Sequence, residues 1–139
     1  MPIQQSEVLY TATATAENGR DGRVATDDGK LDVVVNPPKE MGGNGEGTNP
    51  EQLFAAGYSA CFQGALGVVA RQENADLTGS TVTAKVGIGK NADGFGITVE
   101  ISAEIPAVDA ATARSLVEKA HQVCPYSKAT RGNITVTLA

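Results

Sequence analysis

The sequence contains no tryptophan, and aromatic residues make up only 4% of it. A core must therefore be packed mainly from valine, isoleucine, leucine and alanine. Hydrophobic residues still account for 41% of the 139 residues, which is ordinary for a globular protein. This length and composition suffice for one domain with a real core. We therefore expect a single domain over residues 1–139, and we find no internal repeat.

Positive charge is also scarce, since the formal net charge is −5 at pH 7. Nucleic acids and anionic membranes both select for clustered basic surface, so we expect neither as a partner. Residues 1–7 carry no basic region and no apolar stretch of the kind a secretory signal needs, which predicts a cytoplasmic protein. Residues 53–70 are free of charge, but their Gly, Ser and Gln content favours a buried helix over a membrane span.

Histidine and cysteine are too few for several kinds of site. One histidine and two cysteines do not make a zinc site, and no Cys-x-x-Cys-His haem motif is present. The sequence has no Gly-x-Ser-x-Gly motif and no phosphate-binding loop. Gly87-x-Gly89-x-x-Ala92 loosely matches a dinucleotide fingerprint, but no helix is expected after it. We therefore expect no bound metal or cofactor.

Alternating apolar residues and turn residues predict several strands. The Asp27-Asp28-Gly29-Lys30 stretch has the composition of a hairpin turn, in which glycine supplies a positive φ. A second hairpin is expected around residues 90–94. The expected strands are Val8–Ala16, Val24–Thr26, Leu31–Val35, Thr81–Gly89, Phe95–Ile105 and Asn133–Leu138.

Two helices have clear start signals. Asn49 suits an N-cap and Pro50 the first helical position, so a helix should run from there to about Glu73. Asp109 should cap a second helix that ends at Pro125. Its apolar stripe is Ala113, Leu116, Val117, Ala120, Val123 and Cys124. The order of elements predicts an α+β fold with an antiparallel sheet and one buried helix.

The first helix should also carry a flat face of small residues. Ala56, Ala60 and Gly64 recur at every fourth position. Residues at this spacing share one side of a helix, where a second helix can approach closely.

The two cysteines stand in different environments. Cys61 lies inside the charge-free run, and Cys124 lies at the end of the second helix. They are too far apart for a Cys-x-x-Cys motif, but in an intracellular-looking protein a single pair that meets in the fold favours redox chemistry. A lone cysteine in a core helix is more often a small hydrophobic residue, so reactivity would require a thiolate near positive charge.

That positive charge cannot come from the ends of the expected helices. Cys61 lies too far from the start of its helix, and Cys124 lies at a C-terminus, where the helix dipole disfavours an anion. An arginine elsewhere in the fold would have to supply it, and Arg20 and Arg23 stand out in a short glycine-rich turn. Glu51 can either complement the helix dipole or hold an arginine. His121 is expected to be an exposed helix residue.

Three segments, taken in order, resemble the organic hydroperoxide resistance proteins of the OsmC/Ohr superfamily of thiol peroxidases. They are Asn18–Arg23, Gly47–Phe62 with its Asn-Pro-Glu-Gln-Leu stretch before the first cysteine, and Ala120–Ser127 with Val-Cys-Pro-Tyr-Ser. The resemblance implies an OsmC/Ohr-like α+β fold, with antiparallel sheets around a buried central helix. It also implies an intertwined homodimer with two active sites between the subunits. Asn18 departs from the family, where glycine is frequent, but asparagine tolerates turns.

The resemblance also implies roles for individual residues. Cys61 would be the peroxidatic cysteine and Cys124 the resolving one, while Arg20 would activate the thiolate and Glu51 would orient the arginine. The substrate would be an organic hydroperoxide, and the reductant would be dihydrolipoamide or a lipoylated protein. Phe95 and Tyr126 are candidates for an apolar substrate pocket.

Three alternatives remain open at this point. The chain could belong to the osmotically induced branch, with another peroxide preference. It could be a redox sensor that passes a disulfide to a partner, which would show no turnover with excess dithiol. It could also be a module that binds apolar ligands, which would keep its function in Cys61→Ser.

Overall fold

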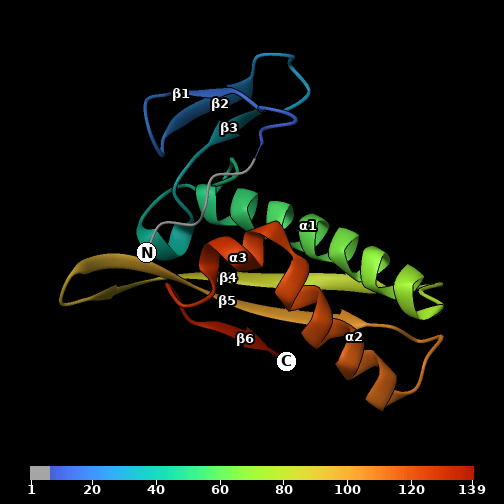
Figure 1. The fold of residues 1–139 in the computed structure, drawn as a ribbon. Coiled ribbons are helices and arrows are strands. Elements are labelled where there is room, and N and C mark those ends of the chain that lie inside the picture. Colours follow the sequence, from blue (N-terminus) through green and yellow to red (C-terminus); the bar gives the residue numbers. More distant parts are fainter. Residues whose placement is uncertain (1–6) are drawn as a thin grey trace. The chain divides into compact units, whose positions relative to one another are not determined.

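The chain forms two compact units, Met1–Pro50 and Glu51–Ala139, in a computed structural model that describes residues 7–139 (Figure 1). Each unit contains its own three-stranded sheet. The sequence-based expectation of a single domain over residues 1–139 stays a prediction.

The N-terminal unit is an antiparallel sheet in the order β1-β2-β3. Its strands are β1 (Ala14–Glu17), β2 (Gly22–Thr26) and β3 (Asp32–Val35), followed by a short 3-10 helix, η1 (Lys39–Met41). Asn18 begins the turn between β1 and β2 with φ of 61°. Its side-chain amide donates to the carbonyl of Asp21 across this turn. Asn18 therefore adopts the left-handed conformation that this turn requires.

The expected strand Val8–Ala16 was wrong over most of its length. Residues 8–13 are exposed and outside any strand, and β1 begins only at Ala14. Ala14 pairs with Thr26, the last residue of β2 before the hairpin turn. Residues before Ala14 therefore have no facing strand within this sheet, although their alternation is typical of a strand.

The second unit begins in the first turn of the long helix α1 (Pro50–Glu73), which starts directly after Asn49 as the sequence predicted. Its buried residues are Tyr58, Phe62, Ala65, Leu66, Val69 and Ala70. By length and composition alone α1 could cross a membrane, a test that the core helix of a soluble protein also passes. The expected small-residue face, Ala56, Ala60 and Gly64, is exposed on the chain.

The second sheet has the order β4-β5-β6. The strands β4 (Thr81–Asn91) and β5 (Gly94–Glu104) form the predicted hairpin, and they extend farther into its turn than expected. The last strand, β6 (Val136–Leu138), pairs with β5 in parallel. The expected antiparallel pairing therefore holds between β4 and β5 but not between β5 and β6. Two helices lie between β5 and β6. Such a helical crossover lets β6 run in the same direction as β5.

These two helices are α2 (Ala110–Val123) and α3 (Pro125–Thr130). The carboxylate of Asp109 accepts from the Thr112 amide at 2.7 Å, which confirms the predicted N-cap of α2. Pro125 ends α2 as predicted, but it also opens α3, which the sequence analysis missed. Proline suits this position because the first helical N–H needs no partner within the helix.

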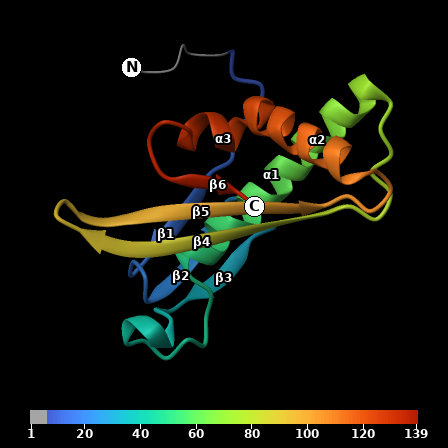
Figure 2. The same cartoon turned by 90° about the horizontal axis from the view of Figure 1, so that it is seen from below.

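The core of the second unit lies between α1, α2 and the sheet. In Figure 2, α1 passes behind the β4–β5 hairpin, and α2 and α3 lie to one side of the hairpin. The core cluster joins Phe62 and Leu66 of α1 to Ile101 of β5 and Leu116 of α2, all fully buried. Alternate residues of β4 face this core, as the period of two predicted.

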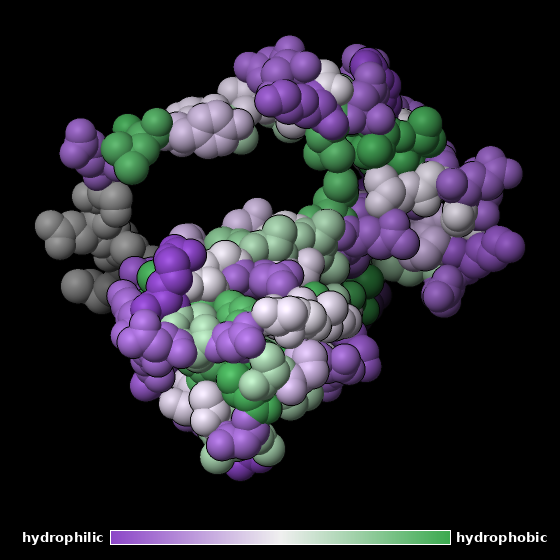
Figure 3. Space-filling model, turned by 90° about the vertical axis from the view of Figure 1, so that its right-hand side faces the viewer, coloured by the Kyte–Doolittle hydropathy of each residue, from purple (hydrophilic) through white to green (hydrophobic). Residues whose placement is uncertain are grey.

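Several large apolar side chains remain on the surface of the chain. Figure 3 shows hydrophobic areas beside hydrophilic ones on one face. The most exposed are Val8, Leu9, Tyr10, Phe95 and Val34.

Candidate active site

The structure brings the two cysteines together. Cys61 lies in the fourth turn of α1 and Cys124 lies at the junction of α2 and α3, and the two Sγ atoms are 3.6 Å apart. Both are free thiols, with Cys61 partly buried and Cys124 fully buried. A disulfide requires the sulfurs to approach to about 2.05 Å, so a short movement would join them.

Tyr126 contributes a backbone group to the same site. Its N–H donates to the sulfur of Cys61, and this hydrogen bond favours the thiolate. Burial acts in the opposite direction and has the larger effect, and the neighbouring Cys124 adds to it, so the pKa of the Cys61 thiol lies above its ordinary value. A reactive thiolate at Cys61 therefore needs a further source of positive charge.

Cys124 occupies a position that the sequence did not reveal. It is the C-cap of α2, as expected, and at the same time the N-cap of α3. Its carbonyl accepts from the Lys128 amide at 3.0 Å, and its own amide donates to Ala120 at 2.8 Å. The backbone of Cys124 is therefore tied into both helices.

An apolar cavity of about 460 Å³ opens beside Tyr126. It is lined by Phe54, Pro125, Tyr126, Ala129 and Thr130. The rings of Phe54, Tyr58 and Tyr126 form a cluster, with centroids 5.6 to 6.0 Å apart. Phe54 was missed by the sequence analysis, although its spacing of seven from Cys61 places both on one side of α1.

Phe95, the other pocket candidate, does not line this cavity. It is 66% exposed at the end of the β4–β5 hairpin, where the Lys90 ammonium lies 5.7 Å from its ring centroid. A role for Phe95 toward a substrate stays a prediction.

Buried hydroxyl groups connect α1 to α3. The Tyr58 hydroxyl lies 2.8 Å from Ser127 Oγ and 3.0 Å from Thr130 Oγ1. His121 Nδ1 lies 2.8 Å from the same Ser127 oxygen, and Arg131 donates to the His121 carbonyl. The expectation that His121 is an exposed residue was therefore wrong. Burial, and then the charge of Arg131, lower the pKa of the His121 imidazole.

The charged candidates lie at the positions that the sequence indicated. Arg20 lies in the turn between β1 and β2 of the N-terminal unit. Arg23, the other candidate, forms two hydrogen bonds of 2.7 Å with Asp32 in the same unit. Glu51 lies in the first turn of α1, and the helix continues unbroken from there to Cys61.

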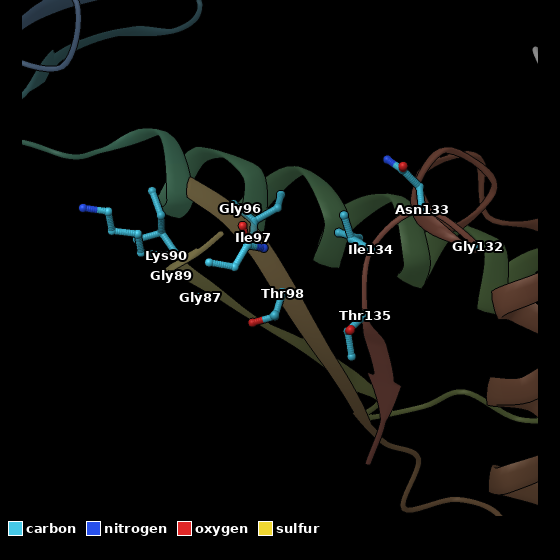
Figure 4. A pocket seen from close by; sticks show the side chains of 12 residues that line it. Gly87, Gly89, Lys90, Gly96, Ile97, Thr98, Gly132, Asn133, Ile134 and Thr135 are labelled. Atoms are coloured by element: carbon cyan, nitrogen blue, oxygen red, sulfur yellow. The ribbon is translucent and has the colours of Figure 1, made fainter. Parts of the chain in front are cut away.

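A second, larger cavity lies at the distal end of the hairpin. It has a volume of about 590 Å³ and lies between residues 87–98 of the hairpin and residues 132–135 (Figure 4). Neither cysteine lines it. Within residues 7–139, no three His, Cys, Asp or Glu side chains gather as a metal site would require.

The model of the OsmC-like protein family matches residues 43–139. The chain is also 56% identical over 134 residues to the organic hydroperoxide resistance protein of Xanthomonas axonopodis pv. citri, covering 95% of this chain and 94% of that one. The chain belongs to the organic hydroperoxide resistance proteins of the OsmC-like family. The family expected from the sequence is thereby confirmed.

Solved structures of this family share the fold. An organic hydroperoxide resistance protein from Elizabethkingia anophelis is 54% identical, with a TM-score of 0.90 and 96% of each chain covered. OhrB of Bacillus subtilis is 45% identical, with a TM-score of 0.86, covering 94% of this chain and 98% of that one. These similarities confirm the expected OsmC/Ohr-like α+β fold, with two small sheets and a central helix.

Proposed function

We propose that this protein is a thiol-dependent peroxidase that reduces organic hydroperoxides to alcohols. The observation that carries the proposal is the pair of thiols 3.6 Å apart, one of them held by the Tyr126 amide. The apolar cavity beside Tyr126 supports a substrate with a bulky organic group. Membership of the organic hydroperoxide resistance proteins supports the same substrate class.

The proposed reaction begins at Cys61. Its thiolate attacks the distal oxygen of the hydroperoxide, the O–O bond breaks, and the alkoxide takes up a proton to leave as an alcohol. Cys61 is oxidised to a sulfenic acid. The Cys124 thiol then attacks this sulfur, so that a disulfide forms and water leaves. Cys124 is more buried than Cys61. This suits the resolving role, because the resolving thiol reacts with Cys61 and does not have to meet the substrate.

Recycling requires an external dithiol. We propose dihydrolipoamide or a lipoylated protein as this reductant, with no cofactor bound to the protein itself. One of its thiols would attack the Cys61–Cys124 disulfide and release one cysteine, and its second thiol would then release the other cysteine and close a ring. The proposed location of this reaction is the cytoplasm.

Arg20 is proposed as the group that lowers the pKa of Cys61. Burial raises that pKa, so a guanidinium near the sulfur would favour the thiolate and stabilise the departing alkoxide. Glu51 would orient Arg20 through a carboxylate–guanidinium pair. The resemblance of the Asn18–Arg23 turn to the family assigns this role to Arg20, whereas Arg23 forms two hydrogen bonds with Asp32.

A homodimer with shared active sites is part of the proposal. Glu51 and Cys61 lie ten positions apart on the continuous helix α1, so about 15 Å separates them along its axis. A second subunit could bring a carboxylate to Cys61 where the same helix cannot. The exposed small residues Ala56, Ala60 and Gly64 would allow close packing of two such helices.

Peroxide turnover and its products test the proposal. Tert-butyl hydroperoxide should be consumed faster than hydrogen peroxide, with dihydrolipoamide as reductant and glutathione as a poor substitute. Cys61→Ser should abolish turnover, while Cys124→Ser should allow one oxidation and then, under excess peroxide, over-oxidise at Cys61. Mass spectrometry that found the over-oxidised sulfur at Cys124 of the wild type would reverse the roles. Full function of Cys61→Ser would favour the ligand-binding alternative.

A further inference from the structure

The contact between Tyr58 and Ser127 repeats the spacing of the contact between the cysteines. Tyr58 lies three positions before Cys61 on α1, and Ser127 lies three positions after Cys124. Tyr58 meets Ser127 at 2.8 Å, and Cys61 meets Cys124 at 3.6 Å. Residues three apart on a helix share one side, so the hydroxyl pair lies about one helical turn from the thiol pair.

The hydroxyl contact is fully buried and has several partners. Tyr58 and Ser127 have no exposed surface, and Thr130 is 5% exposed. Ser127 also meets His121 on α2, so a single side chain links α3 to both longer helices. Buried hydroxyl groups that satisfy one another define one arrangement of the elements that carry them.

The short helix α3 depends on these contacts because it has only six residues. Its first part supplies two groups to the candidate site, the thiol of Cys124 at its N-cap and the N–H of Tyr126. The position of α3 against α1 therefore sets the distance between the two sulfurs.

We propose that Tyr58 is a positioning residue for the resolving step, acting through its hydroxyl on Ser127 and Thr130 to hold Cys124 against Cys61. The inference rests on the proposed function for its place in a peroxidase cycle. The quantity that it concerns is the equilibrium constant for forming the Cys61–Cys124 disulfide. Loss of the hydroxyl lowers the effective concentration of the Cys124 thiol at Cys61 and slows the resolving step more than the first oxidation of Cys61.

The first measurement is the equilibrium of the Cys61–Cys124 disulfide of the full chain in dithiothreitol redox buffers, followed by thiol trapping. Tyr58→Phe keeps the ring and removes only the oxygen. We expect it to shift the equilibrium about tenfold toward the dithiol, a size typical of losing one or two buried hydrogen bonds. Ser127→Ala should shift the disulfide equilibrium in the same direction. Ser127→Thr keeps a hydroxyl and should therefore shift it less than Ser127→Ala does.

The second measurement separates the two chemical steps. After one equivalent of tert-butyl hydroperoxide, Tyr58→Phe should lose less of the rate of sulfenic acid formation than of the rate of disulfide formation. It should form the disulfide about tenfold more slowly and, when excess hydroperoxide is then added, accumulate over-oxidised Cys61. Val69→Ala is the matched control, because it truncates a core residue of α1 that has no polar contact with α3.

The outcomes separate this inference from the proposed function. An unchanged disulfide equilibrium in Tyr58→Phe would overturn the inference, as would an equal shift in Val69→Ala. If the wild type forms the disulfide in redox buffer but not with a hydroperoxide, the proposed function fails, and the buffer measurement still decides the role of Tyr58. If Tyr58→Phe does not fold, Ser127→Ala with its Ser127→Thr partner makes the same decision.

Discussion

Gly57 lets the ring of Tyr126 lie directly on helix α1. A Cβ atom at position 57 would stand 2.8 Å from the Tyr126 hydroxyl oxygen and 3.2 Å from the nearest ring carbons. Gly57 lies one turn before Cys61, and Tyr126 both donates its N–H to that sulfur and lines the apolar cavity. The absence of a side chain at position 57 therefore helps to shape the candidate site.

Gly57→Ala should displace the Tyr126 ring and impair the use of bulky substrates. We expect kcat/KM for cumene hydroperoxide to fall roughly tenfold, because packing strain of about 1–3 kcal/mol must be relieved by moving the ring. The better helix propensity of alanine, about 1 kcal/mol, should offset part of the loss in stability. Steady-state kinetics and urea unfolding provide the two measurements.

Gly67→Ala is the control on the same helix. Its added Cβ would make only an ordinary contact of 3.6 Å with Arg71, so it should stabilise the protein slightly and keep wild-type kinetics. If Gly57→Ala keeps full kcat/KM for cumene hydroperoxide, the position of the Tyr126 ring does not matter to the substrate.

Arg20→Ala should raise the pKa of the Cys61 thiol and slow its oxidation far more than Arg23→Ala does. Arg23 is held by Asp32, which makes it a control from the same turn region. Arg20→Lys should restore little, because an ammonium cannot form the planar fork that pairs with a carboxylate. The pH dependence of Cys61 alkylation measures the effect. An unchanged profile in Arg20→Ala would rule out Arg20 as the activating group.

Acidification should destabilise the protein through His121 before the carboxyl groups protonate. The folded state lowers the pKa of His121 below its ordinary 6.5, so the unfolded chain binds a proton more readily. The contribution of His121 to the free energy of unfolding should therefore be fully present above pH 6.5 and decline as the pH falls below it. Arg131 is the charged neighbour that contributes to this shift, beside the uncharged Ser127.

Urea unfolding at pH 7.5 and at pH 5.5 tests this expectation. His121 is the single histidine of the chain, so His121→Asn should remove most of the decline over this range. The carboxyl pKa values that the fold shifts, such as that of Asp109, are lowered from 3.8 and act only at more acidic pH. An equal decline in His121→Asn would assign the effect to other groups.

Glu51 and Cys61 should complement each other between two chains. Cys61→Ser and Glu51→Ala should each be inactive as homodimers. If Glu51 acts across the dimer, a mixed dimer has one site with both lesions and one intact site. Refolding the two variants together should therefore restore part of the activity. No recovery in a verified heterodimer would place Glu51 in the site of its own chain, and a fully active monomer at micromolar concentration would exclude a shared site.

Short sequence patterns correctly predicted where the helices α1 and α2 begin. The start of α1 at Pro50 and the cap of α2 at Asp109 depend on residues within a few positions, and both were confirmed. The direction of β6 and the length of β1 depend on which strand lies opposite, and no local pattern contains that information. Both were wrong for this reason.

The candidate site was predictable to a similar extent. The pairing of the cysteines followed from the family resemblance, since spacing alone left it open. The partners of Tyr58 lie 69 and 72 positions away, so no sequence pattern could reveal them. Phe54 could have been found, because its helical spacing from Tyr58 and Cys61 places all three on one side of α1.

Cys124 stands where two helices join and belongs to the interior of neither. The backbone of a residue inside a helix moves together with the helix. The backbone of a residue between two helices can move through changes in a few dihedral angles. Closing the 3.6 Å gap between the sulfurs therefore asks for a small change in the dihedral angles at Cys124, while the Tyr58 contacts keep α3 against α1. Oxidation should accordingly be felt most in the amide hydrogen exchange of residues 125–130, which would make this short helix a reporter of the redox state of the protein.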